Sequence, residues 1–334
     1  MGDIKIFAGR SNEPLVKSIA AYVKDKIWHD TFERKTVLGV LDDRRNFNDG
    51  ELYARIAESV RGKDVFIVQS TNQPDLHFKE LLVLAHVAYH ASAERVTAVI
   101  PYLGYSRQDW KDKSRAPVTI IPDAKSLEAQ RVNRALLLDV HSNAITDVYM
   151  ARDILTDHIW ARPVFVRYLK EHESEWKSDR PLVIAAPDSN AVKLARAYAK
   201  DLKAEGRIVM IDKFRPSPGD AVVMNIVGDV SDKDVLIVDD MIDSAKTTCN
   251  AAEALRDRGA RNVFALATHG VFSDNAFIRI ENSPIKLLFV TDSIYLSSAV
   301  LYKTSKLRVV SVAGLLGEAI FRIHKNQSVS SLFE

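Results

Sequence analysis

Three aspartates and a hydroxyl-rich turn stand close together in the stretch DVLIVDDMIDSAKTTCNAAEAL, residues 234–255. Asp239, Asp240 and Asp243 follow an apolar run that is typical of a buried strand. The Ser-Ala-Lys-Thr turn then leads into a segment of helical period, and the free N–H groups at a helix N-terminus favour phosphate. Carboxylates and phosphate repel each other unless sugar hydroxyls or a cation separate them, so this combination indicates a phosphorylated sugar as ligand. The alternative is a simple helix cap made by Asp243 or Ser244.

The chain around this stretch alternates short apolar runs with segments of helical period. Nearly continuous apolar strands are buried on both faces, as in a parallel sheet, and the helices between them provide crossover connections. Candidate strands begin near residues 64, 96, 135, 182, 207, 234, 262 and 286. Candidate helices cover residues 79–91 and 190–206, and another follows a cap at Ser11 or Asn12. The pattern predicts an α/β protein whose ligands bind beyond the carboxyl ends of its strands.

Length and charge restrict the possible classes of protein. A chain of 334 residues is long enough for two domains, because single cores stop growing near about 250–300 residues. Lys plus Arg number 46 and Asp plus Glu 44, so the formal charge of +2 predicts neither nucleic acid nor an anionic membrane as a partner. The single cysteine, Cys249, excludes a disulfide within the chain and a multi-cysteine zinc site.

No stretch of the sequence predicts targeting or membrane insertion. The N-terminal residues MGDIKIF lack the apolar core of a signal peptide, and Ile6 stands where a myristoylation signal has Ser or Thr. No apolar run reaches the roughly 18 residues that are needed to span a bilayer. We therefore expect a soluble, cytoplasmic protein.

Motifs along the rest of the chain, together with the acidic turn, resemble those of one protein family. VLIVDDMIDSAKT resembles the ribose-phosphate-binding loop of the phosphoribosyltransferase fold, and it is most similar to that of the ribose-phosphate pyrophosphokinases. The same family pattern is matched, in chain order, by RSNEPLVKSIA, NFNDGE, ESVRGKDVFIVQST, IPYLGYSRQDWKDKSRAPVT, IDKFRP, VMNIVGDV and QSVSSLF. Because the resemblance covers nearly the whole chain in order, a helix cap alone is a poor explanation of the aspartates.

The resemblance implies two phosphoribosyltransferase-like domains, each a mainly parallel sheet flanked by helices. We expect an N-terminal domain with ATP-binding motifs at residues 1–155 and a C-terminal domain with the ribose-phosphate loop and a catalytic flap at 156–308. A C-terminal helix and tail at 309–334 should pack on the N-terminal domain. The stretch 150–163 is the best candidate for a linker, and 212–222 is the predicted flap. Members of the family form homo-oligomers, so an assembly between dimer and hexamer is expected.

The resemblance also implies a reaction. The family transfers the β,γ-diphosphate of ATP to the anomeric hydroxyl of ribose 5-phosphate and releases AMP, and oxygen ligands beside phosphates point to Mg²⁺ as cofactor. The matching residues are Phe47, Asp49, Glu51, Arg107, Gln108, Asp109 and His141 for ATP, His141 and Asp188 for the metal, Lys213 and Arg215 for catalysis, and Asp239, Asp240, Asp243, Ser244, Ala245, Lys246 and Thr247 for the ribose phosphate. Phe47 suits adenine stacking and Arg107 suits a triphosphate. Lys213 and Arg215 would stabilise charge on the transferring group.

Each of these motifs has a plainer interpretation when it is taken alone. FNDGE would then be an ordinary turn, SRQD would contribute a surface ion pair, and His141 would be a structural histidine. A phosphoribosyltransferase that consumes the activated sugar is disfavoured, because FNDGE, SRQD and KFRP match the ATP-using branch of the fold.

Three departures from the family pattern lie near the acceptor. Lys246 stands where the phosphate turn usually has glycine, Asp188 is followed by Ser-Asn-Ala in place of a glycine pair, and the residues after His141 lack the usual glutamine. Replacing glycine in an anion turn removes backbone freedom and adds a cation. Lys246 would supplement the 5-phosphate site, reshape it for a larger acceptor such as ADP-ribose, or mark a non-catalytic regulatory subunit. The retained acids and basic residues favour an active enzyme, and we expect ribose 5-phosphate as its acceptor.

Overall fold

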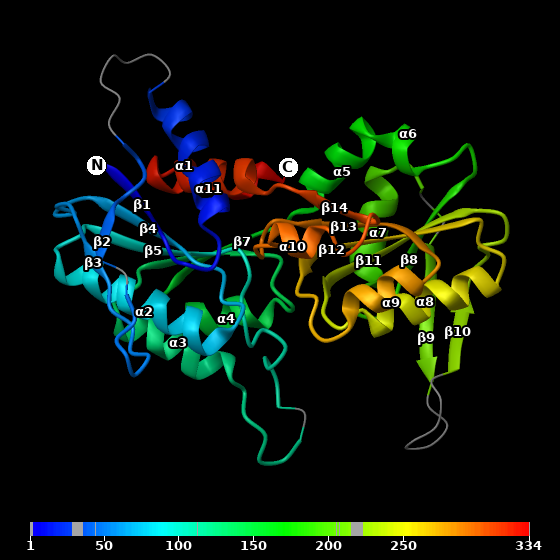
Figure 1. The fold of residues 1–334 in the computed structure, drawn as a ribbon, viewed down its shortest axis with the longest axis horizontal. Helices are drawn as coiled ribbons and strands as arrows, with labels where there is room; N and C mark the ends of the chain where they lie inside the picture. The colour runs from blue at the N-terminus through cyan, green and yellow to red at the C-terminus, as the bar shows by residue number, and fades with distance from the viewer. Residues whose placement is uncertain are drawn as a thin grey trace. The chain divides into compact units, whose positions relative to one another are not determined.

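The computed structural model describes residues 3–28, 36–43, 45–111, 113–204, 206, 208–214 and 223–333. The chain forms two compact units, which are traced in Figure 1. The first unit contains Met1–Ala161, Ser293–Tyr295 and Ser311–Glu334, and the second contains Arg162–Asp292 and Leu296–Val310. The chain therefore enters the second unit within the predicted linker stretch, and it returns to the first unit for its last residues.

The first unit is built on a five-stranded parallel sheet. Its order is β1-β4-β5-β6-β7, so the first strand in sequence lies at one edge and the remaining strands follow in chain order. The strands are β1 (Ile4–Ala8), β4 (Asp64–Val68), β5 (Arg95–Ile100), β6 (Arg134–Leu138) and β7 (Leu155–Ile159). A separate antiparallel pair is formed by β2 (Leu41–Asp43) and β3 (Arg55–Ile56).

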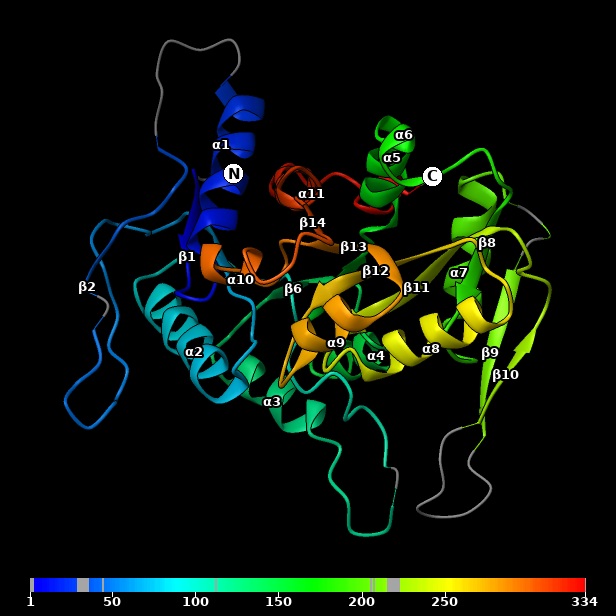
Figure 2. The same cartoon turned by 45° about the vertical axis from the view of Figure 1, so that its right-hand side comes forward.

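Helices cover both faces of this sheet, which explains the nearly continuous apolar strands. Val65 and Ile67 of β4 pack with residues of the helices on one face, while Phe66 and Val68 are buried on the other. The helices are α1 (Glu13–Trp28), α2 (Pro74–His90), α3 (Ile120–Ala129), α4 (Ala144–Met150) and α11 (Ala313–His324), followed by the 3-10 helix η1 (Ser330–Leu332). In Figures 1 and 2, α1 and α11 lie on one side of the sheet and α2 and α3 on the other.

The C-terminal helix α11 is held against α1 by close packing. The Tyr22 hydroxyl donates a hydrogen bond of 2.9 Å to Glu318 Oε2. A Cβ added at Gly317 would lie only 2.7 Å from the Tyr22 ring, so the two helices can approach this closely only because residue 317 is glycine.

The second unit contains a seven-stranded sheet of order β10-β9-β8-β11-β12-β13-β14, which is parallel except for β10. Its strands are β8 (Leu182–Ala186), β9 (Ile208–Phe214), β10 (Val223–Val227), β11 (Asp234–Ile242), β12 (Asn262–Gly270), β13 (Ile285–Thr291) and β14 (Leu307–Val310). Its helices are α5 (Arg162–Glu171), α6 (Glu173–Trp176), α7 (Val192–Asp201), α8 (Lys246–Asp257), α9 (Ala276–Asn282) and α10 (Ser298–Leu301). Figure 1 shows α5 and α6 on one side of this sheet and α8 and α9 on the other.

All eight predicted strands are present, but several predicted bounds are wrong. The helix predicted at 79–91 begins at Pro74, because proline is well suited to the first turn of a helix. The helix predicted to reach Gly206 ends at Asp201, where Lys203 takes a left-handed φ of 56° and the Ala204 N–H bonds back to the Ala199 carbonyl. The proposed linker 150–163 contains strand β7, so only part of it is irregular.

The helix predicted after Ser11 or Asn12 is α1, and Asn12 Oδ1 accepts a hydrogen bond from the Leu15 N–H at 3.3 Å.

None of the helices in the described ranges combines the length and apolar character required of a membrane span.

Candidate active site

The acidic cluster lies near the carboxyl end of β11, the central strand of the second unit. The sequence predicted that this strand ends before the aspartates, whereas β11 continues to Ile242 because β12 pairs with it as far as Gly270. On its other side, β8 stops pairing at Ile237. Asp239 and Asp240 therefore lie beyond the last residue paired with β8, which leaves room for a ligand beside them.

The two neighbouring carboxylates crowd each other. The Asp240 N–H donates to Asp239 Oδ1 at 3.0 Å, and the Met241 N–H donates to Asp240 Oδ1 at 2.9 Å. Burial, the Asp240 carboxylate and the more distant Asp188 together raise the pKa of Asp239 to about 8. Without a ligand, this environment therefore favours a proton shared by the Asp239 and Asp240 carboxyl groups, and a ligand that donates hydrogen bonds or carries positive charge would favour the ionised form.

Asp188 approaches this cluster from the loop between β8 and α7. Its Oδ1 accepts hydrogen bonds from the N–H groups of Asn190 at 3.0 Å and Ala191 at 3.2 Å. This arrangement fixes the carboxylate at the start of α7 while it remains close enough to raise the pKa of Asp239. Asp188 thus stabilises the turn before α7 through these backbone hydrogen bonds. It also contributes negative charge near Asp239 and Asp240.

The turn after β11 presents the N-terminus of α8. Ala245 precedes the helix with φ 60° and ψ 1°, a left-handed conformation that alanine rarely adopts. Lys246 is the first helical residue and its side chain is exposed. The expected loss of backbone freedom at residue 246 is therefore wrong, because the position that would favour glycine is Ala245. The first N–H groups of the helix, with the exposed Thr247, form a potential phosphate site.

Residues from the segment after β12 support the turn. Ser273 Oγ donates to Asp243 Oδ1 at 2.5 Å, and an Arg279 guanidinium nitrogen donates to the Ser244 carbonyl at 2.8 Å. Arg279 is itself held by Asp274 at 2.8 Å. The sequence did not reveal Ser273 and Arg279 as supporting residues, because they lie about 30 residues away and have no motif of their own.

The strain at Ala245 gives a stability prediction. Ala245→Gly should raise the free energy of unfolding by about 0.5–1 kcal/mol, because glycine adopts a positive φ without steric cost. The matched change Ala254→Gly, inside α8, should lower it by about 1 kcal/mol. Chemical denaturation of both variants measures this difference. Destabilisation by Ala245→Gly would contradict the left-handed conformation at residue 245.

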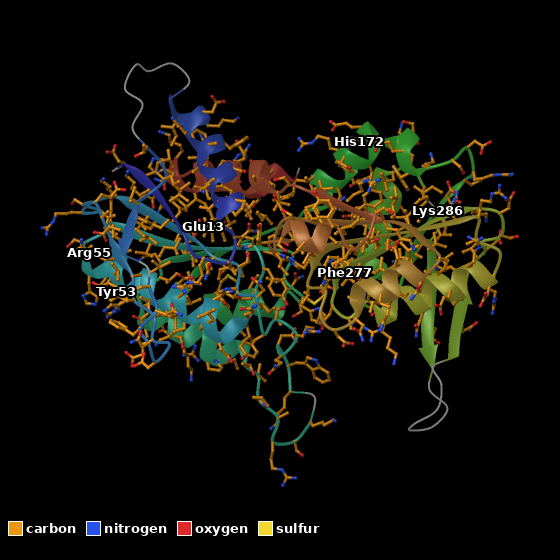
Figure 3. The ribbon with its side chains drawn as sticks, in the orientation of Figure 1. Glu13, Tyr53, Arg55, His172, Phe277 and Lys286 are labelled. Carbon is orange, nitrogen blue, oxygen red and sulfur yellow. The ribbon has the colours of Figure 1, made fainter. Side chains whose placement is uncertain are left out.

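In the first unit, Phe47, Asp49 and Glu51 belong to the hairpin between β2 and β3. The Phe47 N–H donates to the Glu51 carbonyl at 2.8 Å, and Asp49 Oδ1 accepts the Glu51 N–H at 3.0 Å. The Phe47 ring is 45% exposed. The Arg45 guanidinium lies 5.4 Å from the ring centroids of both Phe47 and Tyr53. The hairpin, whose Tyr53 and Arg55 are labelled in Figure 3, thus offers an exposed aromatic ring beside a cation.

Arg107, Gln108 and Asp109 lie in the loop that follows β5. The loop is anchored through the Tyr105 hydroxyl, which donates to Asp75 Oδ1 at 2.8 Å, and through the Thr119 hydroxyl, which donates to Gln108 Oε1 at 2.5 Å. Arg107 and Gln108 are exposed. The amide oxygen of Gln108 therefore serves to position the loop, a role that the motif did not predict.

His141 is exposed and follows β6 after a strained turn. Asp139 has a left-handed φ of 40°, and its Oδ2 accepts the Ala161 N–H at 2.9 Å. His158 Nε2 accepts the Val140 N–H at 3.2 Å, and burial lowers the pKa of His158 to about 4, so that it stays neutral. Strand β7 thereby fixes the backbone that carries His141, a role of His158 that no sequence motif indicates.

Some predicted residues are only partly described. The backbone of Lys213 belongs to β9 and pairs with Met224 of β10, but its side chain lies outside the described part of the structure, as does the whole of Arg215. His141 belongs to the first unit and Asp188 to the second, so the metal role expected of this pair stays a prediction.

The donor set fits a divalent cation that shares its coordination with substrate. Within the described ranges, no three or more His, Cys, Asp and Glu side chains form a cluster that would hold a metal ion alone. Mg²⁺ does not require such a cluster, because it is usually held by one or two carboxylates together with phosphate oxygens and water. Burial and, after it, the neighbouring carboxylates raise the pKa of Asp239, and a bound cation would favour its ionised form.

Comparisons with known proteins agree with this geometry. Residues 4–130 match a family model described as the N-terminal domain of ribose phosphate pyrophosphokinase, and residues 209–334 match a phosphoribosyl synthetase-associated domain. The chain is 41% identical over 332 residues to the ribose-phosphate pyrophosphokinase of Agrobacterium fabrum, covering 99% of this chain and 100% of that protein. It is 42% identical over 332 residues to that of Fusobacterium nucleatum, with coverages of 99% and 98%.

A solved structure supports the same assignment. The crystal structure of phosphoribosylpyrophosphate synthetase from Mycobacterium smegmatis matches with a TM-score of 0.85 and 30% identity, covering 97% of this chain and 99% of that one. These comparisons confirm the predicted resemblance, the α/β fold with phosphoribosyltransferase-like domains, and the prediction of an enzyme of the ribose-phosphate diphosphokinase type. The chain therefore belongs to the ribose-phosphate pyrophosphokinase family.

Proposed function

We propose that this protein transfers the β,γ-diphosphate of ATP to the anomeric hydroxyl of ribose 5-phosphate in a Mg²⁺-dependent reaction that releases AMP. The main support for this proposal is that the neighbouring carboxylates of Asp239 and Asp240 on β11 are followed closely by the N-terminus of α8. The carboxylates are acceptors for sugar hydroxyls, and the helix N-terminus is a donor site for the 5-phosphate. A phosphorylated sugar carries hydroxyl groups whose hydrogen bonds the carboxylates can accept and a phosphate that the helix N-terminus can bind.

Lys246 is proposed to supplement the 5-phosphate site. A cation in the first turn of a helix is unfavourable, because it faces the positive end of the helix dipole. An anion bound between Lys246 and the N–H groups of α8 would remove this penalty. Asp239 and Asp240 are proposed to orient the ribose, and Asp243, Ser244, Ala245 and Thr247 to form the phosphate turn.

The nucleotide residues are proposed to act in the first unit. Phe47 stacks on the adenine beside Arg45 and Tyr53, while Asp49 and Glu51 lie near the base and Arg107, with Gln108 and Asp109, engages the triphosphate. The exposure of the Phe47 ring and of Arg107 supports these roles, because a substrate must reach them.

Charge on the transferring group is proposed to be stabilised by Lys213 and Arg215, since phosphoryl-type transfer depends mainly on positioning and electrostatics. Mg²⁺, when bound, would neutralise phosphate charge, and Asp188 and His141 are the proposed metal-proximal residues. The carboxylate of Asp188 is held by two backbone N–H groups, so it is preorganised for this role.

The reaction is tested by measuring AMP formation from ATP and Mg²⁺ with ribose 5-phosphate, with ADP-ribose, and with no acceptor. We expect AMP only with ribose 5-phosphate, because relatives that align over their full length are named for that activity. AMP formed mainly with ADP-ribose would reassign the acceptor. Absence of AMP with both acceptors, in folded protein that binds ATP, would instead support a regulatory subunit.

The variant Lys246→Ala, measured in the same assay, tests the proposed role of Lys246. If Lys246 contacts the 5-phosphate, the variant should raise the KM for ribose 5-phosphate about three- to tenfold and leave the KM for ATP unchanged, which is the effect of one partly exposed ion pair. The same kinetic assay on Lys233→Ala, a surface lysine paired with Asp229, is the matched control.

A cytoplasmic location and assembly into a homo-oligomer, between dimer and hexamer, also stay part of the proposal.

A further inference from the structure

Two histidines share the outer face of α2, in a part of the first unit to which the proposed reaction assigns no role. His86 and His90 are four residues apart, so both side chains project from the same side of the helix. Both are exposed, and their ring centroids are 4.3 Å apart with an interplanar angle of 48°. Two imidazoles at this helical spacing are the arrangement by which helices bind zinc in metalloproteases.

The hydrogen bond of His86 prepares one ring nitrogen for a metal ion. Its Nδ1 lies 3.0 Å from Gln130 Oε1, at the end of α3. An amide oxygen only accepts, so the proton is on Nδ1 and the lone pair is on Nε2. A hydrogen bond from the second ring nitrogen to a neighbouring oxygen is the usual outer support of a histidine that binds a metal.

The surroundings favour a cation at this position. His90 is the last residue of α2, where the negative end of the helix dipole attracts positive charge. The last turn of the helix contains no lysine or arginine. The Tyr89 ring packs edge-on against His90 with centroids 5.2 Å apart, which restricts the histidine side chain.

The ring spacing is compatible with a shared ion. Two imidazoles that bind one ion at about 2.0–2.1 Å, with roughly 90–110° between the bonds, have ring centroids roughly 4.5–5 Å apart. The observed centroid distance of 4.3 Å is close to this range. We propose that His86 and His90 form a two-histidine site for Zn²⁺, Ni²⁺ or Cu²⁺, ions that imidazole ligands prefer over Mg²⁺.

The site would be open. The described residues supply no third His, Cys, Asp or Glu side chain to this pair, so water fills the remaining positions of the ion. It therefore differs from a closed structural zinc site, which has four protein ligands, and its affinity should be moderate. Loss of either histidine leaves a single imidazole, which does not chelate.

The test is calorimetric titration of the full chain with Zn²⁺, and separately with Ni²⁺, in a buffer without phosphate and with excess Mg²⁺ to saturate sites that prefer oxygen ligands. We expect one equivalent to bind the wild type, and His86→Ala or His90→Ala to weaken this binding at least about tenfold. Both residues are exposed, so thermal unfolding of the variants in the absence of metal should match the wild type.

His172→Ala is the matched control. His172, labelled in Figure 3, donates through Nδ1 to the Tyr168 carbonyl at 2.9 Å, and its ring stacks on the Tyr168 ring with centroids 4.2 Å apart. Like His86, it has an Nδ1 hydrogen bond to an oxygen atom and a ring neighbour one helical turn away, but it is partly buried and its neighbour is not an imidazole. Unchanged binding in His172→Ala, with loss in both α2 variants, supports the site. Wild-type affinity in either α2 variant, or no binding by the wild type, overturns it.

Discussion

Asp240→Asn is expected to lower kcat/KM for ribose 5-phosphate by at least about 100-fold while it makes the free protein more stable at pH 8. A hydrogen bond to a carboxylate contributes roughly 1.5–3 kcal/mol, and the proposed acceptor site would lose such bonds to the ribose hydroxyls. The KM for ATP should change little, because the proposed nucleotide residues are elsewhere in the sequence. Steady-state kinetics with each substrate varied in turn measures both effects.

The gain in stability follows from the raised pKa of Asp239. Its folded pKa is about 8 and the ordinary value is 3.8, so between these pH values the folded protein retains a proton that the unfolded chain releases. The free energy of unfolding therefore falls as pH rises through this window. This loss of stability is absent only below the lower of the two pKa values. Asp240→Asn removes the neighbouring charge, and it should raise the stability at pH 8 by about 1–3 kcal/mol and flatten the pH dependence.

A surface aspartate provides the control for this prediction. Asp232 pairs with Arg180 and has a side chain that is 55% exposed, so Asp232→Asn should change stability by less than about 0.5 kcal/mol at either pH. Chemical denaturation of both variants at pH 5 and pH 8 gives the comparison. Equal stability of wild type and Asp240→Asn at pH 8 would show that the two carboxylates do not repel.

Asp64→Ala is expected to destabilise the first unit by about 3–5 kcal/mol, because it breaks a buried ion network and removes the carboxylate that Arg95 and His324 share. Asp64 is 2% exposed and begins β4. Arg95 Nε donates to Asp64 Oδ1 at 2.8 Å, and a second Arg95 nitrogen donates to Oδ2 at 2.5 Å. His324 Nδ1 lies 3.0 Å from Oδ2, and Arg95 also donates to the Ile323 carbonyl at 3.1 Å.

This network joins the sheet to the end of α11. Burial alone would raise the pKa of Asp64, but hydrogen bonds from His324 and Arg95 outweigh it and lower the pKa below the ordinary 3.8. A lowered pKa contributes stability above the unfolded value, and this contribution is lost as pH falls through the folded value. Wild-type protein should therefore lose part of its stability below about pH 4, and Asp64→Ala should not show this loss.

Urea denaturation and limited proteolysis of α11 measure the effect of Asp64→Ala. The control is Asp42→Ala, which removes an ion pair whose Arg55 side chain is 66% exposed and should cost less than about 1 kcal/mol. Protection of α11 equal to that of the wild type in Asp64→Ala would show that packing against α1 is sufficient to hold the helix.

The pattern of apolar residues was a reliable guide to the strands and a poorer guide to the ends of the elements. Strands such as β4 and β8 are apolar throughout because helices cover both faces, and this signal is local in sequence. The end of β11 was missed because it depends on pairing with β12 as far as Gly270. The end of α7 was missed because a lysine, and not glycine, takes the left-handed position after it.

The candidate site shows the same division. Motif similarity predicted roles for Asp239, Asp240 and the turn at residues 243–247, since consecutive residues carry that signal. It did not identify the residues that support them from a distance, Ser273, Arg279 and His158, because each acts through one hydrogen bond whose donor and acceptor are set by the fold.

The sequence by itself determined the α/β class, the family and the chemical types gathered around the acidic turn, because these depend on periodicity and on contiguous motifs. Only the tertiary structure decided that the strain falls on Ala245 and not on Lys246, and that Asp188 helps to raise the pKa of Asp239. It alone joined Asp64 to His324, 260 residues later. Backbone conformation, burial and charge crowding depend on which distant segments meet, and that information is present only when the chain is folded.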